Sequence, residues 1–268
     1  MALWNTLSAA AAILFMYMTA LFLIALLRRD NSIADVAWGP GFILAAWATF
    51  LLYGSFSARQ WVANLLVLCW GLRLAVRIYL RNRGKGEDER YRKWREEWGS
   101  SFVVRSYLQV FLLQGAILLL NVTPVLFINT FAAGPLGWLD VLGVAIWLVG
   151  FSFESLADRQ LDRFVKDPAN RGKIMDRGLW RYSRHPNYFG EVTMWWGLYL
   201  VALSVPWGWA SVIGPLTITY IILFVSGVPM TERFMEKNPA FADYKRRTSA
   251  FVPWFPRKGA EQRGRSEP

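Results

Sequence analysis

Residues 5–27 read "NTLSAAAAILFMYMTALFLIALL" and contain no charged side chain. A helix of this length can cross the hydrocarbon core of a bilayer, which is about 30 Å thick. Similar apolar runs recur along the 268-residue chain, in which 54% of the residues are hydrophobic. We therefore predict an all-α integral membrane protein with seven transmembrane helices. The predicted spans are 5–27, 33–54, 60–80, 106–129, 137–156, 188–205 and 209–230.

The basic residues predict how these spans are oriented. If the N-terminus lies outside, the inner segments hold 27 of the 30 Lys and Arg residues, and Arg59 is the one base in an outer segment. Lys and Arg accumulate in cytoplasmic loops, so we expect the N-terminus outside and the C-terminus in the cytoplasm. The net charge of +11 then reflects topology and does not require a nucleic-acid partner. The inner segments are 28–32, 81–105, 157–187 and 231–268.

Domain organisation follows from composition. The first run lacks the basic segment of a signal peptide, so we expect it to be retained as a span. We predict one domain over residues 1–256 and a disordered basic tail over 257–268, where apolar residues are almost absent. The single cysteine, Cys69, excludes an internal disulfide. One cysteine and one histidine also cannot build the usual structural zinc site, so we expect no metal.

Several polar residue types meet where the sixth span begins, in "RGLWRYSRHPNYFGE" (177–191). Pro186 suits the first turn of a helix, and a helix N-terminus attracts anions through its free N–H groups and dipole. If the helix starts there, Asn187 and Glu191 lie one turn apart on the same face. These residues indicate a binding site at the cytoplasmic end of the span. The alternative is a capped helix start with snorkelling arginines.

A second polar stretch follows the third span, where residues 82–85 read "NRGK". Glycine lets the backbone approach a phosphate while neighbouring bases neutralise it. The alternative is a basic cluster that contacts anionic lipid. The same four letters recur at 170–173. Nearer the membrane, Asp35 is an acid just inside the second span, either functional or ion-paired with Arg73 or Arg77.

Four stretches resemble the steroid 5-alpha-reductase family, and its bacterial members most. They are "DNSIADVAWG" (30–39), "NRGK" (82–85), "RYSRHPNYFGE" (181–191) and "YKRRTSAFVPW" (244–254). The resemblance covers about residues 30–256. It implies a seven-helix membrane enzyme that uses NADPH to reduce a carbon–carbon double bond conjugated to a ketone, typically in a 3-oxo-Δ4 steroid. The cofactor would enter from the cytoplasm and the lipid-like substrate would sit in the helix bundle.

The resemblance also implies roles for individual residues. Asn187 would bind the nicotinamide carboxamide, oriented by Glu191, and the bases would bind the phosphates. Asp35 and Glu191 are the candidate catalytic residues. The animal enzymes polarise the ketone with a Glu in span two and a Tyr in span three, but "CWGLRL" (69–74) has no Tyr here. The implied cofactor-binding residues are Asn82, Arg83, Gly84, Lys85, Arg181, Tyr182, Arg184, His185, Asn187, Tyr188 and Glu191.

Two other functions remain open. Isoprenylcysteine carboxyl methyltransferases share an Arg-His-Pro-x-Tyr element at the start of a late helix, but they bind S-adenosylmethionine. The "NRGKGE" stretch favours the reductase, because a cofactor without phosphates has less need of these bases. The third possibility is a lipid-binding or scaffold protein without catalysis. For the reductase we expect a bacterial inner-membrane protein whose partners are NADPH, a lipid-like substrate and membrane lipid.

Overall fold

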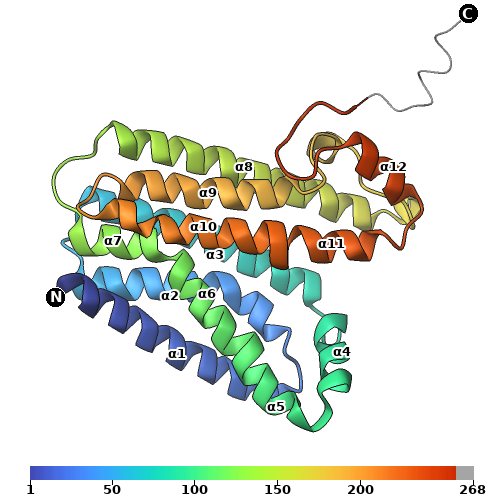
Figure 1. Cartoon of the computed structure of the whole chain (residues 1–268), viewed down its shortest axis with the longest axis horizontal. Coiled ribbons are helices and arrows are strands. Elements are labelled where there is room, and N and C mark those ends of the chain that lie inside the picture. Colours follow the sequence, from blue (N-terminus) through green and yellow to red (C-terminus); the bar gives the residue numbers. More distant parts are fainter. Residues whose placement is uncertain (258–268) are drawn as a thin grey trace, which may run out of the picture. The chain divides into compact units, whose positions relative to one another are not determined.

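The computed structural model describes residues 1–257, which fold into helices and connecting segments without a β-strand (Figure 1). This confirms the all-α prediction. The predicted tail lies, apart from Arg257, outside the described residues. The helices are α1 (Ala2–Arg28), α2 (Ile33–Tyr53), α3 (Ala58–Asn82), α4 (Glu89–Trp98), α5 (Phe102–Arg105), α6 (Leu113–Asn121), α7 (Thr123–Phe131), α8 (Trp138–Lys166), α9 (Pro186–Ala202), α10 (Ile213–Tyr220), α11 (Val228–Met235) and α12 (Ala240–Arg247).

Six helical stretches within residues 1–257 are long and apolar enough to cross a bilayer, which indicates an integral membrane protein. The predicted sixth span coincides with α9, which has 17 residues. At 1.5 Å per residue this helix is about 25 Å long, less than the hydrocarbon thickness. The count of seven spans therefore stays a prediction. The six stretches are Ala2–Arg28, Ile33–Tyr53, Ala58–Asn82, Glu89–Asn121, Trp138–Lys166 and Gly208–Met235.

The chain divides into two compact units. The first comprises Met1–Leu142 and Leu198–Gly214, and the second comprises Gly143–Gly197 and the chain from Pro215 onward. The single domain predicted for residues 1–256 stays a prediction.

In the first unit, α2 packs against both α1 and α3. The approach of α2 to α3 is closest at two glycines, because a Cβ atom added to Gly39 would lie 2.4 Å from the carbonyl oxygen of Gly71. Small residues of this kind let membrane helices come close enough for dense packing. Beside this contact Phe42 of α2 and Trp70 of α3 are both buried and meet edge to face.

Arg59 breaks the charge pattern of the sequence for a structural reason. Its side chain is 4% exposed, and its Nε donates to Oδ1 of Asp140 at 2.7 Å. The Nη groups donate to the other carboxylate oxygen and to the carbonyl oxygens of Ala133 and Pro135. A buried, fully paired guanidinium is held by its partners, so its position reports packing within the first unit and not membrane orientation.

The fourth predicted span, 106–129, has different bounds in the structure. α6 ends at Asn121 and a new helix begins at Thr123, with Pro124 in its first turn. Proline has no N–H to continue the preceding helix, and it suits a helix start. At its other end the apolar helical stretch reaches back to Glu89.

In the second unit α8 runs to Lys166, past the predicted fifth span, and α9 begins at Pro186, the residue that suits a first turn. The two helices cross closely, because a Cβ atom on Gly190 would lie 2.5 Å from the carbonyl oxygen of Gly150. Trp180 fixes the connection between them, since its indole N–H donates to the carbonyl oxygen of Ala157 at 3.0 Å. This contact holds the 177–191 stretch against α8.

Candidate functional site

Arg184 is buried and holds three segments of the second unit together. Its Nε donates to Oε1 of Glu232 at 2.8 Å, and its Nη2 lies 2.7 Å from the same oxygen. Its Nη1 donates to the carbonyl oxygens of Lys245 and Thr248. Most of its N–H donors thus bond to the protein itself. Arg184 therefore connects the start of α9 with α11 and with the C-terminal end of α12.

His185 is 1% exposed, and its Nε2 lies 3.3 Å from Oε1 of Glu232. Its ring stacks on that of Tyr188, whose hydroxyl is 3.0 Å from the hydroxyl of Thr231. Lys245 approaches the second oxygen of Glu232 at 3.2 Å. Hydrogen bonds to Glu236 and to Glu232 raise the pKa of Lys245, which keeps it cationic. Glu232 therefore joins Arg184, His185 and Lys245.

The sequence reasoning missed Glu232. Its signal was an acid at the end of a long apolar helical stretch, and such acids usually face the protein interior. Asp35 and Glu191 are acids in comparable positions near helix ends.

Asn187 differs from its neighbours because it is not fully engaged by the protein. It lies in the first turn of α9, and its side-chain Oδ1 is buried without a hydrogen-bond partner among the described residues. Buried polar atoms nearly always have a partner, so this oxygen calls for a donor from a ligand or a water molecule. Glu191 lies one turn further along the same face and is partly buried.

Arg181 and Tyr182, the first residues of the motif, are exposed. The backbone beside them is covered by the C-terminal segment, because the N–H of Arg184 donates to the carbonyl oxygen of Ser249 and the N–H of Trp254 donates to that of Tyr182. The aromatic ring of Trp254 is itself exposed. The segment after α12 therefore packs along the start of the 181–191 stretch.

In the first unit, Asp35 has partners that the sequence did not indicate. Oδ1 accepts a hydrogen bond from the Tyr91 hydroxyl at 2.7 Å, and Oδ2 lies 2.6 Å from Nη2 of Arg90. Both partners come from α4, and Tyr91 is buried. The sequence offered no signal for this pairing, because α4 is separated from Asp35 by a whole membrane helix.

The loop that contains residues 82–85 is fastened to the start of α2. The N–H of Asp88 donates to the hydroxyl of Ser32, and the N–H of Asn31 donates to the carboxylate of Glu87. Asn82 is partly buried, whereas Arg83, Gly84 and Lys85 are exposed. The first unit thus brings Asp35 near the loop that carries the predicted phosphate-binding bases, while the predicted residues 181–191 belong to the second unit.

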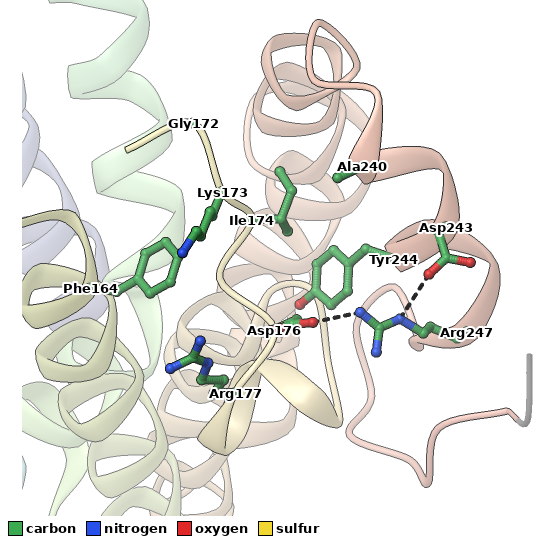
Figure 2. A pocket seen from close by; sticks show the side chains of 10 residues that line it. All are labelled: Phe164, Gly172, Lys173, Ile174, Asp176, Arg177, Ala240, Asp243, Tyr244 and Arg247. Carbon is green, nitrogen blue, oxygen red and sulfur yellow. Dashed lines mark hydrogen bonds and ion pairs between the residues drawn. The ribbon is translucent and has the colours of Figure 1, made fainter. Parts of the chain in front are cut away.

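The two "NRGK" copies fold into the same turn. In both, the glycine has a φ of +77°, and the N–H of the lysine donates to the carbonyl oxygen of the asparagine at 3.0 Å. Glycine is required at this position of a type II turn, because other residues rarely adopt a positive φ. The second copy, at 170–173, contributes to a cavity in the second unit (Figure 2). No cluster of metal-ligating side chains occurs in the described part of the chain.

These features define a class: an all-helical membrane protein with polar and basic groups at helix ends. A family model described as a protein of unknown function, DUF1295, matches residues 21–248. The chain belongs to this family. No solved structure matches the chain at a comparable level of significance.

Curated relatives connect the family with steroid reductases. The 3-oxo-5-alpha-steroid 4-dehydrogenase 1 of Bos taurus is 32% identical over 114 residues, which are 42% of this chain and 41% of the bovine protein. The steroid 5-alpha-reductase DET2 of Arabidopsis thaliana is 34% identical over 77 residues, 28% of this chain and 27% of the plant protein. An uncharacterized protein of Schizosaccharomyces pombe is 25% identical over 264 residues, covering 84% of this chain and 73% of the yeast protein.

The resemblance inferred from the sequence is thereby confirmed: the chain is related to the steroid 5-alpha-reductases. The match spans about two fifths of the length of the bovine and mouse relatives.

Proposed function

We propose that this protein is a membrane reductase that uses NADPH to reduce a carbon–carbon double bond conjugated to a ketone in a steroid-like lipid. The observation that carries the proposal is the buried, unpartnered Oδ1 of Asn187 at the N-terminal end of α9. The amide N–H of a nicotinamide carboxamide can donate a hydrogen bond to this oxygen. The relatives named as steroid reductases support the same reaction.

The residues around Asn187 fit such a cofactor. The helix N-terminus and the exposed side chain of Arg181 favour negative charge, and Tyr182 and Tyr188 offer hydroxyl groups beside them. Arg184 and His185 keep this turn in place through Glu232, while Glu191 orients Asn187 from the next turn. In the first unit, taken by itself, the turn of Asn82, Arg83, Gly84 and Lys85 suits phosphate oxygens, since all but the partly buried Asn82 are exposed. When bound, NADPH supplies the hydride.

The Asp35–Tyr91 pair supplies the group that polarises the ketone. An ionised carboxylate only accepts hydrogen bonds, so Asp35 cannot itself donate to a ketone oxygen. The Tyr91 hydroxyl has one hydrogen, which it donates to Asp35 at 2.7 Å in this structure, and to polarise a ketone it turns this hydrogen from Asp35 to the ketone oxygen when the substrate binds. Tyr91 thus takes the role for which residues 69–74 lack a tyrosine, and Asp35 positions it. Stabilisation of the enolate oxygen by this phenol is the main contribution of the chain to the reaction.

The membrane arrangement completes the proposal. We place seven spans in the bacterial inner membrane, with the N-terminus outside and the cofactor residues on the cytoplasmic side. The asymmetry of the Lys and Arg residues supports this orientation. The apolar helical stretches suit a substrate that arrives from the lipid phase.

Binding measurements test the proposed function directly. The full-length protein, purified in detergent, should bind NADPH with a dissociation constant in the micromolar range, which is typical of working concentrations for enzyme ligands. S-adenosylmethionine should not bind at similar concentrations. Binding of S-adenosylmethionine without NADPH binding would instead establish the methyltransferase and contradict the reductase.

Replacing Asn187 with alanine should weaken NADPH binding about tenfold, the effect of losing one hydrogen bond to a ligand. The midpoint of thermal unfolding should change little, because Oδ1 has no partner within the protein to lose. Titration by tryptophan fluorescence measures the first quantity and a thermal melt the second. Thr193→Ala is the control, since that hydroxyl bonds within α9 to the carbonyl oxygen of Phe189. Equal NADPH affinity in both variants would remove Asn187 from the site.

A further inference from the structure

A groove of about 340 Å³ lies along α8 in the second unit. Five of its lining residues belong to α8, and Leu179 comes from the connection between α8 and α9. Apart from Ser152 the lining is apolar, and the side chains from α8 are partly or fully exposed at the surface of the chain. The groove is lined by Leu148, Val149, Ser152, Phe153, Leu156 and Leu179.

The walls of this groove are fixed by contacts within the protein. The ring of Phe153 meets that of Phe189 edge to face, with 5.4 Å between the ring centroids. The N–H of Leu179 donates to Oε1 of Gln160 at 2.9 Å, and the next residue, Trp180, is bonded to α8 as well. The groove therefore has its shape before any ligand arrives, and a preformed site loses little entropy on binding.

The helix face that carries the groove continues into two bases. Residues three or four apart are neighbours on a helix surface, so Leu148, Ser152 and Leu156 form a stripe that runs on through Arg159 and Arg163. Both arginines are exposed, and neither has a hydrogen-bond or ion-pair partner among residues 1–257. The stripe is thus apolar along the groove and positively charged toward the C-terminal end of α8.

Nearby acids do not cancel this charge. Glu154 and Asp158, which lie in the same turns of α8, are buried and so point away from the exposed stripe. Two unpaired guanidinium groups on one helix face favour an anion with several oxygens, because their donors match phosphate geometry.

The length of α8 places the two parts of the stripe at different depths of a bilayer. Its 29 residues extend about 44 Å, more than the hydrocarbon thickness of about 30 Å. The apolar groove then lies within the hydrocarbon, and the last turns of the helix, with Arg159 and Arg163, reach the level of the lipid headgroups.

We propose that the groove holds an acyl chain of an anionic phospholipid, and that Arg159 and Arg163 bind its phosphate. A free phosphate would leave the apolar groove empty, and a zwitterionic headgroup brings a cation of its own to the two arginines. This lipid site is independent of the proposed reaction, because none of its residues is assigned to NADPH or to the ketone.

Lipid retention tests the headgroup. The full-length protein is reconstituted in phosphatidylcholine nanodiscs with a minor share of phosphatidylglycerol, transferred to detergent, and its retained lipids are counted by native mass spectrometry. Phosphatidylglycerol should be enriched about tenfold to thirtyfold over its share, the effect of two bases that attract anionic lipid. The double variant Arg159→Gln, Arg163→Gln should lose this enrichment. Arg171→Gln, Lys237→Gln is the matched control, which removes the same charge from exposed positions outside α8 and should keep the enrichment.

A second pair of variants tests the acyl chain. Ser152→Trp fills the middle of the groove and should reduce the retained phosphatidylglycerol although both arginines remain. Ala145→Trp is its control, because Ala145 is exposed on α8 about one turn before the groove and does not line it. This variant should retain as much phosphatidylglycerol as the unaltered protein.

Three results would overturn the lipid site. The unaltered protein could retain phosphatidylglycerol only in proportion to its share of the nanodisc. The two double variants could lose the enrichment equally, which would show attraction by the total charge of the protein. Unchanged retention in Ser152→Trp would show that no acyl chain occupies the groove.

Discussion

Replacing Glu232 with alanine should lower the free energy of unfolding by about 3–5 kcal/mol, the usual cost of removing one partner of a buried ion pair. The Arg184 side chain, 8% exposed, and the fully buried His185 would both lose their shared carboxylate. Because these residues form the start of α9, NADPH binding should fall together with stability. Denaturant unfolding of the detergent-solubilised protein, followed by tryptophan fluorescence, measures the loss.

Glu236→Ala is the matched control for this prediction. Glu236 follows Glu232 by one helical turn, is 54% exposed and pairs with Lys245 alone among the described residues. Exposed ion pairs contribute about 0–1 kcal/mol, so this variant should be nearly as stable as the unaltered protein. Equal losses in the two variants would show that Glu232 does not hold the start of α9.

Replacing Tyr91 with phenylalanine should reduce kcat about a hundredfold to a thousandfold, the effect of removing one donor from a site that stabilises an oxyanion. The Kd for NADPH should not change, because the proposed role concerns the ketone. NADPH oxidation in the presence of a 3-oxo-Δ4 steroid measures kcat, and the binding titration measures Kd. An unchanged unfolding midpoint shows that the variant is folded.

Tyr107→Phe is the matched control for Tyr91→Phe. Tyr107 lies in the same helical stretch, Glu89–Asn121, and its hydroxyl is 3.0 Å from that of Thr19. This change should leave kcat unaltered. Full activity of the Tyr91→Phe variant would exclude the phenol as the polarising group and leave Asp35 without its positioning role.

The helices were largely predictable, because lipid imposes a strict rule on sequence. Backbone groups in a bilayer must be paired within a helix, so each span reads as an apolar run of fixed length. Pro186 marked the start of α9 for the local reason that proline fits a first turn. The break between Asn121 and Thr123 was missed, because Pro124 stands inside an apolar run and the hydropathy of that run does not reveal where one helix ends and the next begins.

The candidate site was predictable only where its residues are neighbours in the chain. Asn187 and Glu191 share a helix face, so their spacing indicated a joint role. The pairs Arg184–Glu232 and Asp35–Tyr91 are separated by 48 and 56 residues. Side chains so far apart meet only through the packing of whole helices, and a single sequence does not encode that packing in any local pattern. The unpaired oxygen of Asn187 is likewise visible only when all its neighbours are in place.

Transfer of deuterium tests the central claim most directly. The full-length protein is incubated with NADPH deuterated at the nicotinamide C4 position and a 3-oxo-Δ4 steroid, and the product is analysed by mass spectrometry and NMR. The account predicts a saturated ketone that carries deuterium at the carbon β to the carbonyl. Steroid recovered with its double bond intact, across a panel of such enones and with NADPH bound, would contradict it.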